Sequence, residues 1–313
     1  MGRPARIWLE GADGGEPFVL SGEGLGNLNV ELDDSPSDFY YTPVETIYTE
    51  HAFERGSTYN GLRIKSMTPV FTVNIFGTPQ MPWELADDLW STAWDFTRDS
   101  TLWYETPEKT SLRSLTLRLK QEPTFKPVKD PHLRQHARIT MTTIAPDPFW
   151  YEPSVIDKWR SPIDTSGVDG NGDPIVAYGT VTVSNPTPYP IWPIWQAQAA
   201  PFAGTVWTLP DFSWGNTIYR RAAEDAHRVV VMPPLLANEH VNIDTDENAK
   251  REQVRSPLDT QIYLRMAGKR FSYPLRPRLD PVEVPVAVTG APAGVTVEVR
   301  CPRPWPKPWG MRR

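Results

Sequence analysis

The sequence predicts a mainly β protein with one amphipathic helix, divided into two β-rich domains. Three observations lead to this fold class. Apolar and polar residues alternate in the first half, one long segment has helical spacing, and the second half contains short apolar runs separated by turn residues. The 34 prolines are spread along the chain, and that density discourages long helices and central strands. A chain of 313 residues exceeds the usual size of a single core, which favours two domains.

Strands in the first half are predicted from a period of two. Residues 114–120 (SLTLRLK) and 137–144 (ARITMTTI) each place apolar side chains on one face and polar side chains on the other, as in half-buried antiparallel strands. Residues 69–77 (PVFTVNIFG) are apolar on both faces, which predicts a strand that is covered twice.

One long helix is predicted over residues 82–99 (PWELADDLWSTAWDFTRD). Its apolar side chains recur at helical spacing, Pro82 suits the first turn, and three acidic residues lie near the positive end of the helix dipole. A single amphipathic helix among strands is expected to cover one face of a sheet.

The second half predicts an all-β sandwich. A turn-rich loop (DTSGVDGNGDP) precedes short strands at regular spacing. The predicted strands are residues 178–185, 190–198, 204–210, 228–234, 240–245, 282–290 and 294–300.

The domain boundary is predicted in the stretch IAPDPFWYEP, residues 144–153. Its prolines end the preceding strand, and its aromatic residues are expected to fill a seam between the domains. The proposed hinge consists of Pro146, Asp147, Pro148, Phe149, Trp150 and Tyr151. Trp150→Ala is therefore expected to loosen the domains while each still folds. The predicted domains are residues 1–152 and 153–300, followed by a proline-rich basic arm over residues 301–313.

Composition excludes several classes of function. The net charge of −6 argues against a role built on phosphate neutralisation, although DNA could slide along such a surface without sticking. Cys301 is the only cysteine, so an internal disulfide is excluded. The N-terminus has no signal-peptide pattern and no window resembles a membrane span, so we expect a soluble protein made in a cytoplasm, without a membrane anchor.

No sequence motif supports catalysis, a metal site or a cofactor. DTDENA and DGNGDP resemble calcium loops, but Ala249 and Pro174 stand where the sharp-turn glycine is needed, so both are interpreted as hairpin turns. SGEGLGN lacks the final glycine of a dinucleotide fingerprint. The paired histidines His132 and His136 follow Pro131 and run into a predicted strand, which does not suit two ligands on one helical turn. We predict that the protein is not an enzyme.

The 13 tryptophans allow two interpretations. Those of the second half could form a platform for sugar rings, or they could pack in the core and at subunit interfaces, where tryptophan is enriched. Packing is favoured for the helical pair Trp90 and Trp94. The candidate subunit or partner contacts are Trp192, Trp195, Trp207, Trp214, Arg303, Trp305, Lys307 and Trp309.

The order of these motifs resembles the distal tail protein family (Dit-like minor tail proteins) of long-tailed, non-contractile bacteriophages. The resemblance rests on Pro146 to Tyr151, on VTVSNPTPYPIWPIW with Val183, Asn185, Pro190 and Pro193, on VNIDTDENAKREQ with Ile243, Asp244 and Asp246, and on FSYPLRP. It covers residues 15–300, and the richness in proline and tryptophan is similar to proteins of phages with actinobacterial hosts. The arm after Arg300 departs from the family pattern.

The resemblance implies a ring domain built from a sheet or split barrel with a helix, and a galectin-like β-sandwich. It also implies a structural role in the virion tail tip, assembled in the host cytoplasm. Six copies would form a ring that connects the tail tube protein to the tail-associated hub protein and lines the DNA exit channel, with the tape measure protein threading its centre. The alternative function is a carbohydrate-binding adhesion module that uses the C-terminal tryptophans. An autonomous glycan hydrolase would need a carboxylate pair in a cleft, which the sequence does not reveal.

Overall fold

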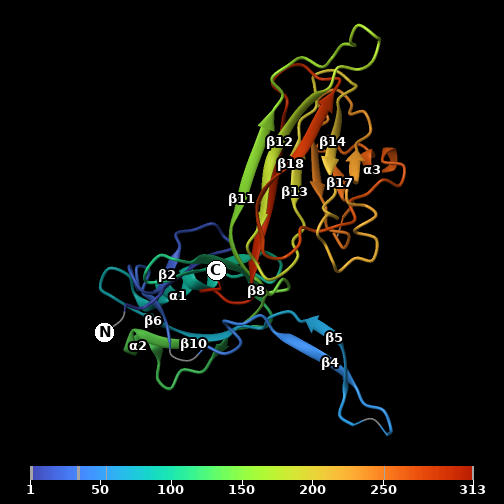
Figure 1. The fold of residues 1–313 in the computed structure, drawn as a ribbon. Helices are drawn as coiled ribbons and strands as arrows, with labels where there is room; N and C mark the ends of the chain where they lie inside the picture. The colour runs from blue at the N-terminus through green and yellow to red at the C-terminus, as the bar shows by residue number, and fades with distance from the viewer. Residues whose placement is uncertain (1–2, 34–35, 54, 250, 312–313) are drawn as a thin grey trace. The chain divides into compact units, whose positions relative to one another are not determined.

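The computed structural model describes residues 3–33, 36–53, 55–249 and 251–311, and its chain divides into two compact units. Unit 1 combines the residues up to Glu152 with Trp305–Met311, and unit 2 comprises Pro153–Pro304. Both units consist mainly of antiparallel strands, as the sequence predicted, and Figure 1 labels their elements.

The strands of unit 1 form a curled antiparallel sheet. They run in the order β2-β1-β7-β8, and β8 pairs with both β10 and the start of β11, while β10 continues to β6 and β3. The two end strands, β2 and β3, contact each other. The bounds are β1 (Arg6–Glu10), β2 (Phe18–Ser21), β3 (Val30–Leu32), β6 (Val70–Phe76), β7 (Ser100–Glu105), β8 (Leu112–Leu119), β9 (Thr124–Phe125), β10 (His136–Ile144) and β11 (Trp150–Arg160).

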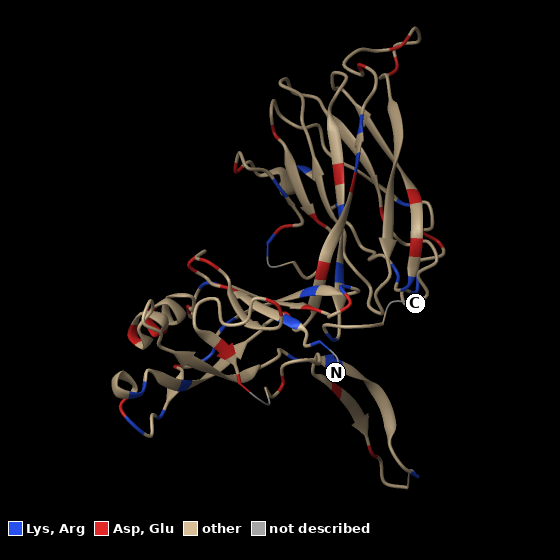
Figure 2. Cartoon of the chain, turned by 90° about the vertical axis from the view of Figure 1, so that its left-hand side faces the viewer, with Lys and Arg blue, Asp and Glu red and all other residues tan. Residues whose placement is uncertain are grey.

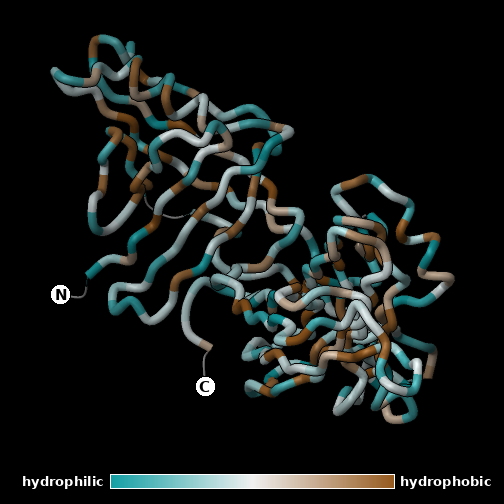
Figure 3. Tube along the Cα trace, turned by 90° about the horizontal axis from the view of Figure 1, so that it is seen from above, coloured by the Kyte–Doolittle hydropathy of each residue, from teal (hydrophilic) through white to brown (hydrophobic). Residues whose placement is uncertain are grey.

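Burial alternates along β8 and β10 as the period of two predicted. Figure 3 shows hydrophobic and hydrophilic residues interspersed along the chain. Strand β6 differs from the prediction in that only one of its faces is fully buried. Phe71, Val73 and Ile75 are buried, whereas the other face is half-buried and carries Thr72 and Asn74, which bond to side chains of β10, as well as Val70 and Phe76.

Helix α1 (Trp83–Thr92) covers the apolar face of this sheet, and its buried side chains are Trp83, Ala86 and Trp90. The helix is shorter than the predicted 82–99. The carboxylate of Asp95 accepts hydrogen bonds from the backbone N–H groups of Thr97 and Arg98, and this local turn replaces further helical hydrogen bonds. A second helix, α2 (Pro131–Arg134), precedes β10, and the Asp130 side chain caps it.

Unit 2 consists of two antiparallel sheets around one core, in the order β17-β16-β13-β19-β11 and β12-β18-β14-β15. All seven predicted strands are present. The bounds are β12 (Ala177–Asn185), β13 (Ile194–Ala197), β14 (Val206–Pro210), β15 (Val229–Val231), β16 (Val241–Asp244), β17 (Val254–Arg255), β18 (Leu279–Thr289) and β19 (Thr296–Trp305), with a short helix α3 (Ile262–Arg265). Both sheets contribute buried side chains to the same cluster, including Trp195 from β13 and Trp207 from β14.

The C-terminal residues do not form the free arm that the sequence suggested. Strand β19 continues through Trp305, and Cys301 is buried. Residues 305–311, here called the C-terminal strap, pack on unit 1. The reason is that the Trp305 side chain is buried in the core of unit 1, and Met311 packs against the same core. Arg312 and Arg313 lie outside the described residues.

Candidate functional site

The face of the unit 1 sheet opposite α1 is open and rich in hydroxyl groups. Its threonines come from four neighbouring strands, and none of them is buried. Thr72 of β6 and Thr140 of β10 oppose each other and their hydroxyl oxygens are 2.9 Å apart, while Thr101 of β7 opposes Thr116 of β8. Because hydroxyl groups donate and accept hydrogen bonds without carrying charge, this face is well hydrated and nearly neutral.

Two arginines on the open face are paired with carboxylates. Arg118 Nε lies 2.7 Å from Asp99 Oδ1, and Arg138 donates to the carboxylate of Asp33. At one edge, the rings of Trp8 and Trp103 stack with centroids 5.7 Å apart. Figure 2 shows acidic and basic residues interspersed over much of the chain. The carboxylates of Asp99 and Asp33 offset the charges of Arg118 and Arg138.

A hairpin made of β4 (Val44–Thr49) and β5 (Thr58–Ile64) projects from unit 1 (Figure 1). Within the described chain, these two strands pair only with each other. The register opposes Val44 to Ile64, Thr46 to Leu62, and Tyr48 to Tyr59. Alternation therefore places these six side chains on one face, which we call the apolar hairpin face.

The apolar hairpin face is uncovered. Val44, Tyr48, Tyr59 and Leu62 are each about half exposed, and the Tyr48 and Tyr59 rings contact each other at a centroid distance of 5.6 Å. Phe53 at the tip is fully exposed. The other face is mostly polar, with an ion pair of 2.8 Å between Glu45 and Lys65 and a hydrogen bond between Thr49 and Asn60, although Ile47 is exposed there. The hairpin was not predicted from the sequence, although the β-branched and aromatic residues of VETIYT are typical of a strand.

Arg113 holds the C-terminal strap on unit 1. Its guanidinium donates to Glu152 Oε1 at 3.1 Å, to the carbonyl of Lys307 at 2.6 Å and to the carbonyl of Gly310 at 2.8 Å. It also lies over the Trp305 ring, 4.2 Å from the centroid. The side chains of Arg113, Glu152 and Trp305 are almost fully buried. The strap is thereby an integral part of the unit 1 core.

Three of the predicted contact residues cannot present a surface, because they are fully buried. Trp195 and Trp207 lie in the core of unit 2, and Trp305 lies in the core of unit 1. The other five are partly exposed: Trp192, Trp214, Arg303, Lys307 and Trp309. Trp309 and Lys307 belong to the strap, where the Trp309 ring packs against Tyr40, Tyr41 and Tyr104.

The predicted hinge residues lie just before the division between the units. Strand β10 ends at Ile144, β11 begins at Trp150, and the division falls after Glu152. Trp150 is fully buried in the core of unit 1 and donates its indole N–H to the carbonyl of Tyr40 at 3.1 Å. The Tyr151 hydroxyl donates to Asp147, and the Thr42 hydroxyl donates to the carbonyl of Pro148. That the six residues set the angle between the units stays a prediction.

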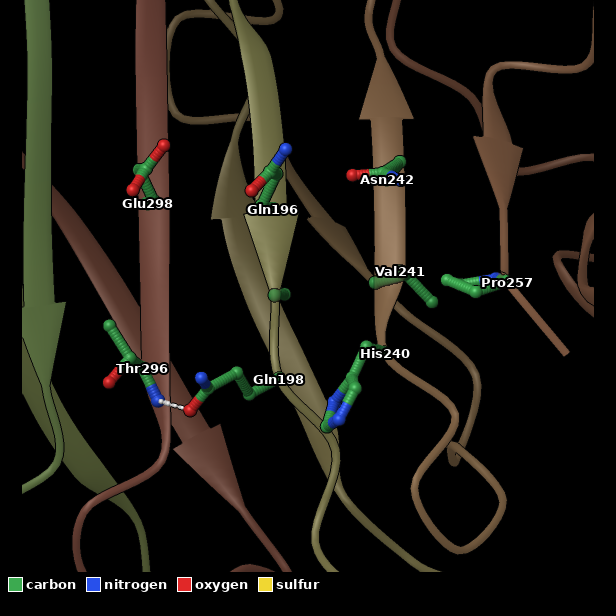
Figure 4. A pocket seen from close by; sticks show the side chains of 9 residues that line it. Gln196, Gln198, His240, Val241, Asn242, Pro257, Thr296 and Glu298 are labelled. Carbon is green, nitrogen blue, oxygen red and sulfur yellow. Dashed lines mark hydrogen bonds between the residues drawn. The ribbon is translucent and has the colours of Figure 1, made fainter.

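A hollow of about 350 Å³ with a mixed lining lies on the outer face of the β19-β13-β16 sheet in unit 2 (Figure 4). Gln196 stands in register with Glu298 on one side and Asn242 on the other. Gln198 accepts a hydrogen bond from the backbone N–H of Thr296, and the ring of His240 lies at the same end. The lining residues include no aromatic ring on which a sugar could stack.

Among the described residues, no group of three or more His, Cys, Asp or Glu side chains is placed to hold a metal ion. None of the helices in the described part of the chain is long and apolar enough to cross a membrane.

Comparison with known proteins gives relatives that match the whole chain, although no family model matches it. The minor tail protein Gp27 of Mycobacterium phage D29 is 28 % identical over 344 aligned residues, which cover 97 % of this chain and 98 % of the relative. The protein of the same name from Mycobacterium phage L5 has the same identity and coverage.

Solved structures share the fold at low sequence identity. The SPP1 Dit protein, described as a paradigm of the hub adsorption apparatus in phages that infect Gram-positive bacteria, has a TM-score of 0.54 and 10 % identity. That match covers 95 % of this chain and 98 % of the Dit chain. A chain of the phage P2 baseplate in its activated conformation has a TM-score of 0.51 and 14 % identity. The match covers 97 % of this chain and 98 % of the baseplate chain. The chain therefore has a Dit-like fold and is homologous over its length to minor tail proteins of mycobacteriophages.

Proposed function

We propose that the protein is a structural component of a phage tail tip, located in the virion tail and assembled in the host cytoplasm. In this proposal six copies form a ring that joins the tail tube protein to the tail hub protein, with the tape measure protein passing through its centre. Support comes from the full-length similarity to minor tail proteins and from the fold shared with Dit and baseplate proteins. The role is structural and requires no catalysis or cofactor.

The open face of the unit 1 sheet is proposed to line the DNA channel. The observation that carries this assignment is the combination of threonine hydroxyls with internally paired charges, such as Arg118 with Asp99. A channel for DNA must be wetted, yet it must not bind phosphates along its wall, because each phosphate contact would add affinity and slow passage. The net charge of −6 acts in the same direction.

The alternative of a carbohydrate-binding module loses part of its support. It relied on the C-terminal tryptophans, and Trp195 and Trp207 are buried among core side chains of unit 2, while Trp192 and Trp214 are partly exposed. The hollow at Gln196 offers polar groups without an aromatic platform. We therefore retain the structural role alone.

The experiment that tests the channel assignment adds positive charge to the open face. Thr116→Lys and Thr142→Lys are expected to leave tail assembly intact and to slow DNA ejection several-fold at low salt, with recovery at high salt as screening increases. Ser91→Lys, on the exposed side of α1, is the matched control and should leave ejection unchanged. Normal ejection kinetics for both threonine variants would contradict the assignment. Imaging of tail tips that carry a label on the protein tests the location and the sixfold ring directly.

A further inference from the structure

We propose that the apolar hairpin face docks on residues 124–134 of a second copy of this chain, so that neighbouring copies join head to tail. The inference deepens the proposed ring and rests on it, because it names the surfaces that close the assembly. Two regions of unit 1 carry it, the β4–β5 hairpin and the segment that contains β9 and α2.

The hairpin has the properties of a surface that is covered by another protein. A two-stranded hairpin has little stability of its own in water, and exposed apolar side chains lower its solubility further. Its polar face is already satisfied by the Glu45–Lys65 and Thr49–Asn60 contacts, while Tyr48, Tyr59 and Leu62 face solvent. Four of the five exposed apolar side chains on the two strands, Val44, Tyr48, Tyr59 and Leu62, lie on one face, and Ile47 lies on the other.

The size of the exposed surface indicates a protein occupant. An aromatic side chain buries about 150–250 Å² when fully covered, so a half-exposed ring offers about 100 Å². Val44, Tyr48, Phe53, Tyr59 and Leu62 together offer about 500 Å² on this scale. A standard protein interface buries about 800 Å² on each partner. The hairpin thus supplies more than half of one side of such an interface.

Residues 124–134 offer a complementary surface on the same unit. Phe125, Val128 and Leu133 are exposed, and Lys126 and Lys129 stand between them. The Phe125 ring stacks on Trp83 of α1 and the Trp83 ring also contacts His132, so the segment is anchored on the helix. The exposed apolar side chains of this segment can bury area against the aromatic rings of the hairpin. Its two lysines can make cation–π contacts with the same rings.

The two surfaces are unlike and lie far apart, which favours a head-to-tail contact. In Figure 1 the hairpin leaves unit 1 on one side, while α2 lies on the other side. Unlike patches on one molecule make heterologous contacts, and these close into a ring when the rotation permits it. A contact between two identical hairpins would give a twofold dimer and would leave residues 124–134 uncovered.

The first test compares two faces of one strand pair. The double variant Tyr48→Asp/Leu62→Asp places charges on the apolar hairpin face, and Ile47→Asp makes the same kind of change on the opposite face of β4. Self-association is measured by sedimentation of the full-length protein and by incorporation into tail particles. We expect the double variant to reduce both by at least tenfold and Ile47→Asp to reduce neither. Circular dichroism checks that the core strands remain folded.

The second test identifies the partner surface by disulfide trapping, because the single natural cysteine, Cys301, is buried. Phe53→Cys combined with Leu133→Cys should give covalent multimers in assembled tails, while neither single variant should. Multimers from Phe53→Cys alone would show hairpins meeting each other and would overturn the head-to-tail arrangement. A ring that persists in the Tyr48→Asp/Leu62→Asp variant overturns the docking surface and leaves the proposed ring standing. Tails that contain no ring of this protein overturn the proposed function itself.

Discussion

Replacing Arg113 by alanine should selectively unfold unit 1. The side chain is fully buried, and it donates to Glu152 and to the carbonyls of Lys307 and Gly310. Arg113→Ala leaves the nearly buried Glu152 carboxylate without this partner and removes both bonds to the strap. The strap also loses the cation that lies over Trp305.

The expected magnitude follows from these contacts. Removal of one partner from a buried ion pair costs about 3–5 kcal/mol, because the other charge loses this partner while it stays buried. A buried carbonyl left without a donor costs about 1–3 kcal/mol, and water at the chain end relieves part of that cost. We therefore expect unit 1 to lose about 5 kcal/mol, which is comparable to the entire stability of many domains.

The assay must resolve the two units, because a two-unit chain does not unfold as one two-state system. Hydrogen exchange in increasing urea should show lower protection for β8 and β10 and unchanged protection for β13 and β14. Arg113→Met combined with Glu152→Leu removes the charge pair altogether and should recover part of the loss, since apolar replacement of a buried pair is often tolerated. A cost below about 1 kcal/mol for Arg113→Ala, or equal losses in both units, would refute the reasoning.

Three further predictions follow from other buried contacts. Trp150→Ala should destabilise unit 1 by about 3–5 kcal/mol, because this ring is fully buried in the unit 1 core. This replaces the expectation from the sequence that each unit still folds in the variant. Unchanged hydrogen exchange of the unit 1 amides would contradict the prediction. Trp309→Ala should cost only about 1–2 kcal/mol, measured by urea titration, because this ring is partly exposed and its contacts with tyrosines are peripheral. Burial raises the pKa of Glu239, but hydrogen bonds led by that from Arg265 outweigh it and hold the pKa below the ordinary 4.5. The ionised carboxylate therefore stabilises unit 2 above that pH and loses its effect as pH falls, so Glu239→Gln should lower the melting temperature at neutral pH and have little effect well below pH 4.5.

Local periodicity predicted the strands well, because the period of two is a property of the chain itself. The alternation of Leu115, Leu117 and Leu119 correctly identified the core face of β8. Arg113 lies on the same face of β8, and an arginine at a core-facing position indicates a buried acidic partner. The sequence carried that signal, but Glu152 and the strap lie far along the chain, and no local pattern identifies such partners.

The burial of individual tryptophan side chains could not be predicted from the sequence. Burial of a ring depends on what the tertiary fold brings against it, so Trp195 and Trp192, three residues apart, differ in exposure. Helix α1 shows a related limit at its end. Helical spacing continued to Trp94, which is buried, but the Asp95 side chain supplies a competing set of hydrogen bonds and the helix stops.

The course of the chain suggests an order of folding. Unit 2 is inserted between Glu152 and Trp305, and the strap contacts of Arg113 span 194 and 197 residues of sequence. Closing a loop of that length in an unfolded chain is entropically unfavourable. Strands β11 and β19 are neighbours in the unit 2 sheet, and a hydrogen bond joins Ser161 to Val295. Once this sheet forms, the chain leading to Trp305 is held beside the chain leading from Glu152. Arg113 can then bind both Glu152 and the strap with little further loss of chain entropy. We therefore expect unit 2 to fold first and the core of unit 1 to be completed last.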